Sequence, residues 1–256
     1  MINEGLEKLT EPNGQFIALS DRSKEIMVMA NSSNVSIHST VLKIRNDSVQ
    51  SKNLIVFKNI NFELVEIVIL GINIKFENCI LIDVTLEDGP EQNSIQIIIL
   101  NCVWKTNIFS HDNRNVVLEP RYQISFKKVR VLKLIFKQSH FFNIFIFLKL
   151  NFFSIQFHQV NFVLDRNEKS DIIGMEGGIY WFLSKNFISL DKVKVALPNQ
   201  NVKTFATFLN IYLESVNLEI RDSKFTSIGR ILGLGYRGRA IDYYTDGIFL
   251  HIKMHN

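Results

Sequence analysis

A ten-residue pattern of apolar and polar positions recurs along most of this chain. Its clearest copy runs from Ile72 to Leu81, and we call its central residue, Phe76, the anchor. Apolar residues lie two and four positions before the anchor, and another lies five positions after it. Alternation with a period of two predicts a strand that buries one face and exposes the other. The pattern therefore predicts a chain of repeated strands.

The copies align in columns of like residues. The anchors, the residues two before them and the residues five after them are all apolar, so these columns should face the core. The anchors are Phe57, Phe76, Ile99, Phe126, Phe136, Phe157, Leu190 and Ile220, with Ile44 as a weaker match. Two before them are Ile55, Ile74, Ile97, Ile124, Leu134, Ile155, Ile188 and Leu218. Five after them are Phe62, Leu81, Trp104, Val131, Phe141, Phe162, Val195 and Phe225. The residue just after the anchor is polar or charged in seven of the eight copies and should face water.

The apolar phase slips by one residue after each anchor, which predicts a bend. Asn59, Asn78, Asn101 and Asp222 lie two positions after their anchors. Asparagine tolerates left-handed backbone and forms hydrogen bonds with nearby main chain. We therefore expect these residues to stack at a corner of the fold.

Anchor spacings of 19, 23, 27, 10, 21, 33 and 30 residues predict the fold. They favour an all-β, right-handed, single-stranded parallel β-helix, a solenoid of irregular coils. Phe126 and Phe136 are too close for successive coils, so we expect them on two sides of one coil. Apolar runs at 64–70 and 205–213 would supply further walls.

An antiparallel sandwich is the alternative fold, because its strands also alternate. It would need hairpin turns, yet Asn-Gly occurs once and Asp-Gly twice. We expect residues 1–34 to form an N-terminal cap or leader, 35–245 the repeats, and 246–256 a C-terminal tail or truncated coil.

Composition narrows the class of protein further. Apolar residues make up 46% of the chain, Phe occurs 21 times and Pro only 4 times, which favours strands. A net charge of +4 without a long basic block argues against a nucleic-acid partner. The most apolar window, Phe141 to Phe157, is interrupted by polar residues and predicts core strands rather than a membrane span. The first residues, Met-Ile-Asn-Glu-Gly-Leu-Glu, lack a basic region followed by an apolar run, so we expect no signal peptide in them.

Three glycosylation sequons, at Asn31, Asn34 and Asn46, favour a secreted or cell-surface location. A fragment of a larger receptor ectodomain is a further hypothesis.

Cys79 and Cys102 share the column three after the anchor and should lie side by side. We expect two buried free thiols rather than a disulfide or a metal site.

The segments Phe57-Lys-Asn59, Phe76-Glu-Asn78-Cys79 and Leu100-Asn101-Cys102-Val-Trp104 resemble the pectin-lyase-like superfamily of right-handed parallel β-helices. The segments Gly177-Gly178-Ile179-Tyr180 and Gly238-Arg239-Ala240-Ile241 are similar to the Gly-Gly-Ala-Ile element of polymorphic outer membrane protein repeats. The resemblance covers roughly residues 35 to 245 and implies the fold. It does not imply one function, because such folds serve as lyases, hydrolases, adhesins and stalks.

Few residues on the outward columns are candidates for catalysis. Asp191 and Arg221 share one outward column, and Glu219 lies in the column two residues earlier. The family's enzymes cut acidic polysaccharides with such carboxylates or basic groups, so these three residues are the catalytic candidates. A surface ion pair is the simpler interpretation. The aspartate motifs typical of polygalacturonases have no match.

Aromatic and acidic residues near the end of the chain could form a ligand-binding site. Tyr243 and Tyr244, beside Asp242, could stack on a sugar and accept its hydroxyl hydrogens. A loop near the last coil is the simpler interpretation. No pattern predicts a metal site or a cofactor.

Two functions remain open. The first is a non-catalytic scaffold or binding segment of a secreted or cell-surface protein, whose partner is a polysaccharide or a cell-surface protein. The second is a polysaccharide lyase or glycoside hydrolase. The regular interior and the lack of a paired-carboxylate cluster favour the first, and the fold resemblance with the Asp191 and Arg221 column motivates the second.

Overall fold

The protein is described by a computed structural model in which every regular element is a β-strand. The described residues are 15–18, 25–29, 36–45, 54–90, 94–107, 123–149, 153–163, 171–176, 186–196, 207–212, 215–226, 230–234 and 249–255. Within these ranges, all strand pairs are parallel and belong to two sheets. The all-β prediction is therefore confirmed, and the antiparallel sandwich is excluded for this part of the chain.

One sheet has nine strands in the order of the sequence. Its strands are β2 (Glu25–Met29), β4 (Leu54–Lys58), β6 (Asn73–Glu77), β9 (Ser94–Leu100), β12 (Val131–Lys137), β15 (Phe153–His158), β18 (Asn186–Asp191), β21 (Ser215–Arg221) and β24 (Phe249–His255).

The other sheet has fifteen strands and divides into two branches. It begins with β1 (Gln15–Ala18), β3 (Ser36–Arg45) and the long β5 (Asn61–Leu70). The first half of β5 pairs with β7 and the second half with β8, so each half starts a branch. The first branch is β7 (Ile80–Ile82), β10 (Val103–Lys105), β13 (His140–Phe142), β16 (Asn161–Val163), β19 (Lys194–Ala196) and β22 (Lys224–Thr226). The second is β8 (Thr85–Asp88), β11 (Ile124–Phe126), β14 (Ile146–Lys149), β17 (Asp171–Glu176), β20 (Thr207–Tyr212) and β23 (Arg230–Leu234).

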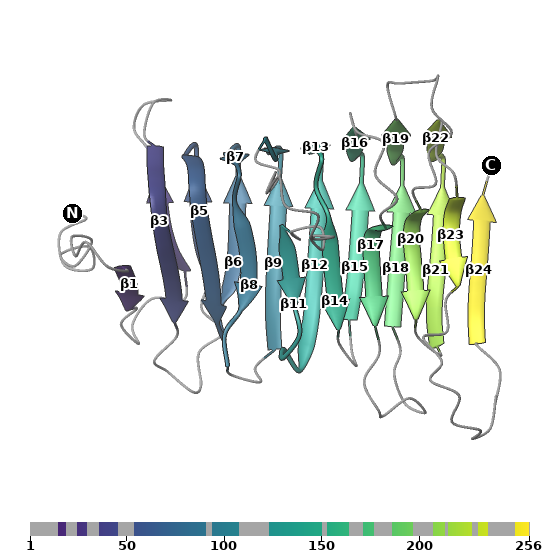
Figure 1. Ribbon diagram of the computed structural model, residues 1–256, viewed down its shortest axis with the longest axis horizontal. Helices are drawn as coiled ribbons and strands as arrows, with labels where there is room; N and C mark the ends of the chain where they lie inside the picture. Colours follow the sequence, from purple (N-terminus) through teal and green to yellow (C-terminus); the bar gives the residue numbers. More distant parts are fainter. Residues whose placement is uncertain are drawn as a thin grey trace, which may run out of the picture.

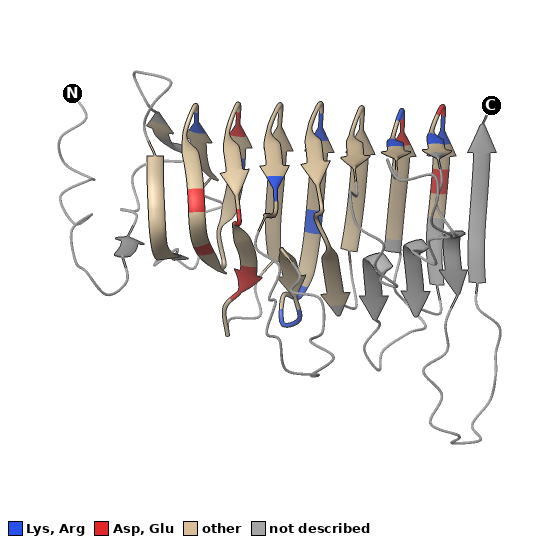
Figure 2. Ribbon diagram, turned by 45° about the horizontal axis from the view of Figure 1, so that its top comes forward, with Lys and Arg blue, Asp and Glu red and all other residues tan. Residues whose placement is uncertain are grey.

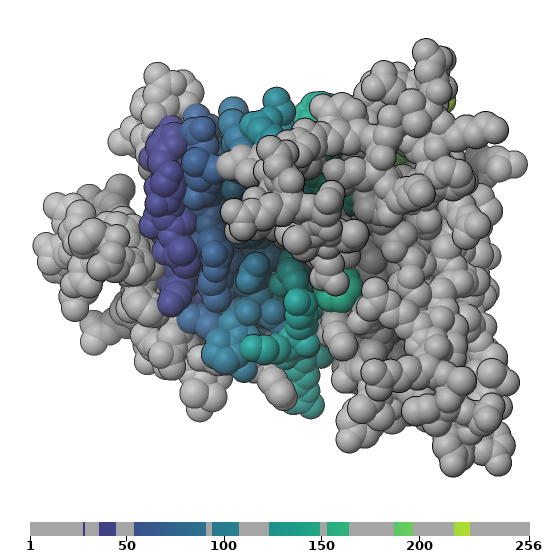
Figure 3. Space-filling model, viewed as in Figure 1, coloured from purple at the N-terminus to yellow at the C-terminus, as the bar shows by residue number. Residues whose placement is uncertain are grey.

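The path of the chain repeats from one pass to the next. From β6 it enters β7 in the first branch, then β8 in the second, and then β9, which pairs with β6. Later passes follow the same order, and the strands lie side by side along the long axis, with β1 and β24 at opposite ends (Figure 1). In the space-filling view, β3 and β5 form adjacent purple and blue columns (Figure 3). The apolar runs at 64–70 and 205–213 lie in or around β5 and β20, as the sequence predicts.

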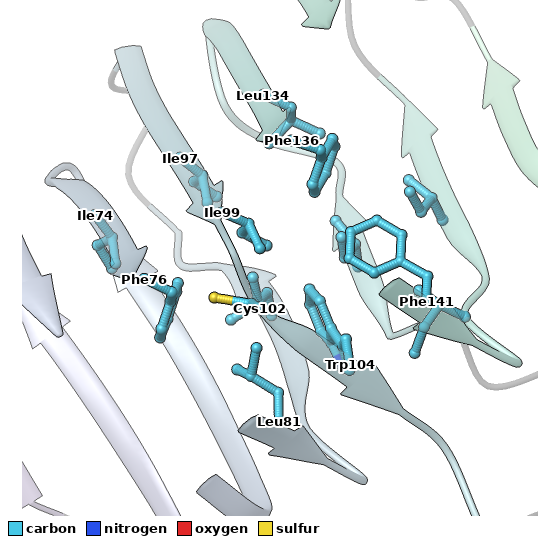
Figure 4. Packing of buried hydrophobic residues seen from close by; sticks show 14 of the residues in the cluster. Ile74, Phe76, Leu81, Ile97, Ile99, Cys102, Trp104, Leu134, Phe136 and Phe141 are labelled. Carbon is cyan, nitrogen blue, oxygen red and sulfur yellow. The ribbon is translucent and has the colours of Figure 1, made fainter. Parts of the chain in front are cut away.

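Strand register aligns the predicted core columns. Phe57, Phe76, Ile99, Phe136, Phe157, Leu190 and Ile220 are successive partners in the nine-stranded sheet. The residues two before them are aligned in the same way, and all of these side chains are buried. The residues five after them align along the first branch. Figure 4 shows members of both sets, such as Phe76 and Leu81, in one interior cluster.

Aromatic rings stack along this interior. Phe136 and Phe157, in neighbouring strands, have ring centroids 4.8 Å apart and nearly parallel planes. Phe141, from the first branch, meets Phe136 edge to face at 5.4 Å. Both arrangements are favourable for aromatic pairs beyond the burial of their area. The rings therefore bind neighbouring strands within a sheet and also join the two sheets.

Three alignments of the sequence pattern are wrong. Phe126 lies in β11 and pairs with Leu148, so it belongs to the second branch and not to the anchor column. Val131, five positions after it, is consequently not a core residue, and it is 40% exposed on β12. Ile44 pairs with Ile69 in the fifteen-stranded sheet. The expectation that Phe126 and Phe136 lie on different walls is confirmed, because β12 belongs to the nine-stranded sheet.

The predicted bend after each anchor is confirmed. The seven residues two after the anchors of the nine-stranded sheet have φ between 45° and 58°: Asn59, Asn78, Asn101, Gln138, Gln159, Lys192 and Asp222. This is left-handed backbone, which Asn and Asp adopt more readily than most residues.

A second left-handed corner separates the two branches. Its residues are Ser39, Leu64, Asp83 and Asn143, with φ between 46° and 57°. Leu64, Asp83 and Asn143 each lie seven positions after their anchors, but the residues of this corner share no residue type, so the sequence pattern did not reveal it.

Strand pairing extends beyond the range in which the repeat is readable. Val28 in β2 is the register partner of Phe57, and Met254 in β24 is the partner of Ile220. Parallel pairing thus continues across residues 34 and 246. The division into cap, repeats and tail stays a prediction.

Candidate binding surface

The first corner carries most of the ordered polar groups on the outside of the molecule. We call it the polar corner and define it by the residues one, two and four positions after each anchor of the nine-stranded sheet. Its residues are Lys58, Asn59, Asn61, Glu77, Asn78, Ile80, Leu100, Asn101, Val103, Lys137, Gln138, His140, His158, Gln159, Asn161, Asp191, Lys192, Lys194, Arg221, Asp222 and Lys224. None of them is buried, as predicted for the column after the anchor. Several passes place a Lys, Arg, Asp or Glu residue at this edge, and other passes between them do not (Figure 2).

Side-chain amides form a ladder at the start of the polar corner. The Asn78 Nδ2 donates to Asn59 Oδ1 at 3.3 Å, and the Asn101 Nδ2 donates to Asn78 Oδ1 at 2.8 Å. The backbone continues the same ladder, since the Asn78 N–H donates to the Leu100 carbonyl at 3.0 Å. These hydrogen bonds pair the side-chain amides of the first three passes with one another. Few of their donors and acceptors are therefore left for a ligand.

Two lysines share one carboxylate near the start of the corner. Glu77 contacts Lys58, with Nζ and Oε1 2.7 Å apart, and also pairs with Lys75. Hydrogen bonds from Lys58 and Lys75 hold the pKa of Glu77 below its ordinary value. Lys58, Lys75 and Glu77 therefore form ion pairs with one another, and the Glu77 carboxylate is not a candidate reactive group.

The structure brings together the three catalytic candidates but pairs them differently from the prediction. Asp191 and Arg221 are register partners on β18 and β21, as expected. The Asp191 Oδ2 lies 2.6 Å from the Nδ1 of His158, on the preceding strand. The Arg221 Nε donates to Glu219 Oε1 at 3.0 Å, and this bond raises the pKa of Arg221.

This arrangement carries little catalytic potential. Asp191 is bound by an imidazole and Glu219 by a guanidinium, so each carboxylate already has a partner. A glycosidase needs two carboxyl groups facing one bond, one of them protonated. The sequence missed His158 as the partner of Asp191, because the apolar and polar pattern alone does not say which polar residues of a column pair with one another.

Several other candidate sites lie outside the described residues. They are the predicted ligand site at Asp242, Tyr243 and Tyr244 and the sequons at Asn31, Asn34 and Asn46. In the part of the chain that the structure describes, no group of three or more His, Cys, Asp or Glu side chains could hold a metal ion. The same residues contain no helix long and apolar enough to cross a membrane.

The cysteine pair is as the sequence predicts. Cys79 and Cys102 are buried free thiols, and the Cys79 N–H donates to Cys102 Sγ at 3.4 Å. The Cys102 thiol donates to the Leu100 carbonyl at 3.2 Å. The contact with Cys79, together with burial, raises the pKa of Cys102, so this thiol is protonated and unreactive. The pair serves as packing.

Sequence reasoning also missed Asp88, a structural anion. Its Oδ2 accepts backbone N–H groups of Lys127 at 2.9 Å and Val129 at 3.0 Å, and also that of Lys128. Asp88 ends β8, whereas these donors lie in the turn between β11 and β12. The carboxylate therefore fixes this turn against the preceding pass. Forty residues separate the partners, so no local motif could reveal the contact.

Comparison with known proteins found no matching family model, no similar curated protein and no similar solved structure.

Proposed function

We propose that the chain is a right-handed parallel β-helix of the pectin-lyase-like type that acts as a non-catalytic, elongated scaffold. It would belong to a secreted or cell-surface protein and bind glycans or other proteins through its outer faces. The parallel pairing of every described strand supports the fold, together with the repeated path through three rows of strands.

One observation carries the proposed function. The described interior forms one apolar cluster, whereas the carboxylates of the outer catalytic candidates are each bound to a basic side chain from the same sheet. A rigid core with an inert but polar exterior suits a structural or binding role. Binding groups on such a scaffold are held in place by the strands rather than by loops.

Screening the protein against an immobilised panel of neutral, uronic-acid and sulfated glycans tests this function. We expect retention of at least one glycan without any change in its chain length. Failure to retain any glycan would remove glycans as the partner class, and shortening of a bound chain would contradict the non-catalytic role.

A carbohydrate-active lyase or hydrolase is the second candidate. The observation in its favour is that Asp191, Arg221 and Glu219 lie on neighbouring strands in one outward region. Depolymerisation assays with uronic-acid polysaccharides separate the two candidates. Turnover that is lost in Asp191→Ala but kept in Lys133→Ala, an exposed site on β12, would establish the enzyme.

A further inference from the structure

Three lysines gather at the end of the polar corner. Lys194 and Lys224 are direct register partners on β19 and β22, and Lys192 occupies the bend two residues before Lys194. All three side chains are exposed. Strands in a sheet lie about 4.8 Å apart, so the backbones of Lys194 and Lys224 are separated by roughly that distance.

The cations of this cluster exceed the nearby anions. Asp191 is bound to His158, and Glu219 is bound to Arg221. Asp222 is the remaining acidic residue of these two passes of the corner. With histidine neutral, Lys192, Lys194, Lys224 and Arg221 carry four positive charges against the three negative charges of Asp191, Glu219 and Asp222, which leaves a formal charge of +1. The two lysines in direct register, Lys194 and Lys224, form the most concentrated positive part of this surface.

Stacking two lysines directly across neighbouring strands is unfavourable. Like charges in opposed positions repel and destabilise a sheet. At the equivalent positions of earlier passes stand Asn61, Ile80 and Val103, so the fold itself does not need a cation there. An anion bound between Lys194 and Lys224 would turn this repulsion into attraction.

The surroundings of the cluster suit a chain of sugars. Along the same corner, the two preceding passes present Gln138, His140, Gln159 and Asn161, whose side chains can form hydrogen bonds. Asn161 Nδ2 and His140 Nδ1 lie 3.1 Å apart, so this hydrogen bond fixes the two side chains next to each other on neighbouring strands. Such groups can bind hydroxyls of successive sugar units, and none of the residues that define the polar corner is aromatic in the sense of Phe, Tyr or Trp, which would stack on nucleic-acid bases.

We propose that Lys192, Lys194 and Lys224 bind the sulfate groups of a sulfated glycan whose chain continues along the polar corner toward His140. This inference rests on the proposed function as a glycan-binding scaffold and names the ligand class. Lysine suits sulfate because its ammonium acts as a point charge with three donors, without the planar fork that matches carboxylate. Binding should weaken as salt increases, because the attraction lies at the surface.

The test measures affinity for heparin oligosaccharides by calorimetry, with desulfated heparin and hyaluronate as carboxylate-only probes. The variants are Lys194→Gln/Lys224→Gln and Lys194→Glu/Lys224→Glu, and the control is Lys105→Glu, an exposed lysine of β10 in the same branch. We expect the charge-reversed variant to bind heparin at least about tenfold more weakly, the neutral variant to fall between, and the control to match the parent protein. Circular dichroism of each variant checks its fold.

The outcomes separate the two proposals. Equal losses in the control and the cluster variants, or equal affinity for desulfated heparin, would overturn the sulfate site. Retention of neutral glycans alone would also overturn it but leave the scaffold function standing. Failure to bind any glycan would overturn the site and also remove glycans as the partner class of the scaffold. Anionic phospholipid vesicles form a further arm, and binding to them that depends on Lys194 and Lys224 while heparin binding does not would assign the cluster to lipid phosphate instead.

Discussion

Asparagine at the first corner acts through its backbone and its side chain together. Asn78 has φ of 54°, and its amide lies between those of Asn59 and Asn101 in the ladder. Left-handed backbone costs an ordinary residue about 1–2 kcal/mol. Asparagine is therefore favoured at this position for two reasons: it adopts the left-handed backbone readily, and its side chain forms the amide hydrogen bonds.

Replacing Asn78 tests both demands. We expect Asn78→Ala to lower the free energy of unfolding by about 2 kcal/mol, because alanine keeps the strain and loses the amide bonds. Asn78→Gly should cost roughly half as much, since glycine adopts positive φ without strain. Urea titration measures both values. Equal losses in the two variants would show that the backbone conformation is not strained.

Glu77 provides a residue-scale prediction on pH. Its pKa is lowered in the folded protein by Lys58 and Lys75, so its ion pairs stabilise the fold above the ordinary carboxyl pKa of 4.5. This contribution is lost as the pH falls below that value, because the carboxyl group becomes protonated. NMR titration should show a midpoint below 4.5 that returns toward it in Lys58→Met/Lys75→Met. A midpoint unchanged by the double substitution would contradict this assignment.

At the scale of the element, each strand of the nine-stranded sheet sorts its residues onto an inner and an outer face. On β12, Leu132, Leu134 and Phe136 are fully buried, whereas Val131 and Lys133 are exposed. The rings of Phe136 and Phe157 then fix one strand against the next. The inner face of such a strand supplies most of its buried area, although Ile135 on the other face of β12 is also buried.

Two substitutions on β12 test this division. Phe136→Ala should lower the free energy of unfolding by about 3–5 kcal/mol, because it leaves a cavity between Phe141 and Phe157. Val131→Ala should change it by no more than about 0.5–1 kcal/mol, since its side chain is partly in water. Chemical denaturation compares the two. Similar effects would show that the register of β12 is wrong.

The sequence predicts the strands whose apolar phase is anchored by a following bend. The columns that contain Phe76 and Phe141 could be aligned because the same one-residue slip separates them in each copy. A polar residue also follows the anchor in nearly every copy. The second branch could not be aligned, because its apolar runs lack such a marker and because Ile124 and Phe126, followed by Lys127, imitate the repeat. The lysine cluster was also missed, since it depends on which passes are neighbours, and irregular loops hide that information.

At the scale of the whole molecule, parallel pairing makes the structure nearly one-dimensional. Each strand contacts those one pass earlier and one pass later, so the stability of the described part depends on contacts between neighbours. The same arrangement repeats a side-chain position along the outside at a constant interval. The polar corner, and the lysines at its end, follow from that repetition.

Distances between spin labels on one outward column test this arrangement most directly. Lys75, Ser189 and Glu219 belong to a single column, and Ser189 and Glu219 are four and five strands from Lys75. With cysteines introduced at these positions and the native Cys79 and Cys102 replaced by serine, pulsed electron resonance should give backbone separations of about 19 Å for Lys75 with Ser189 and about 24 Å for Lys75 with Glu219. Two distances that do not increase by one strand spacing would contradict the parallel, in-register stacking on which the account depends.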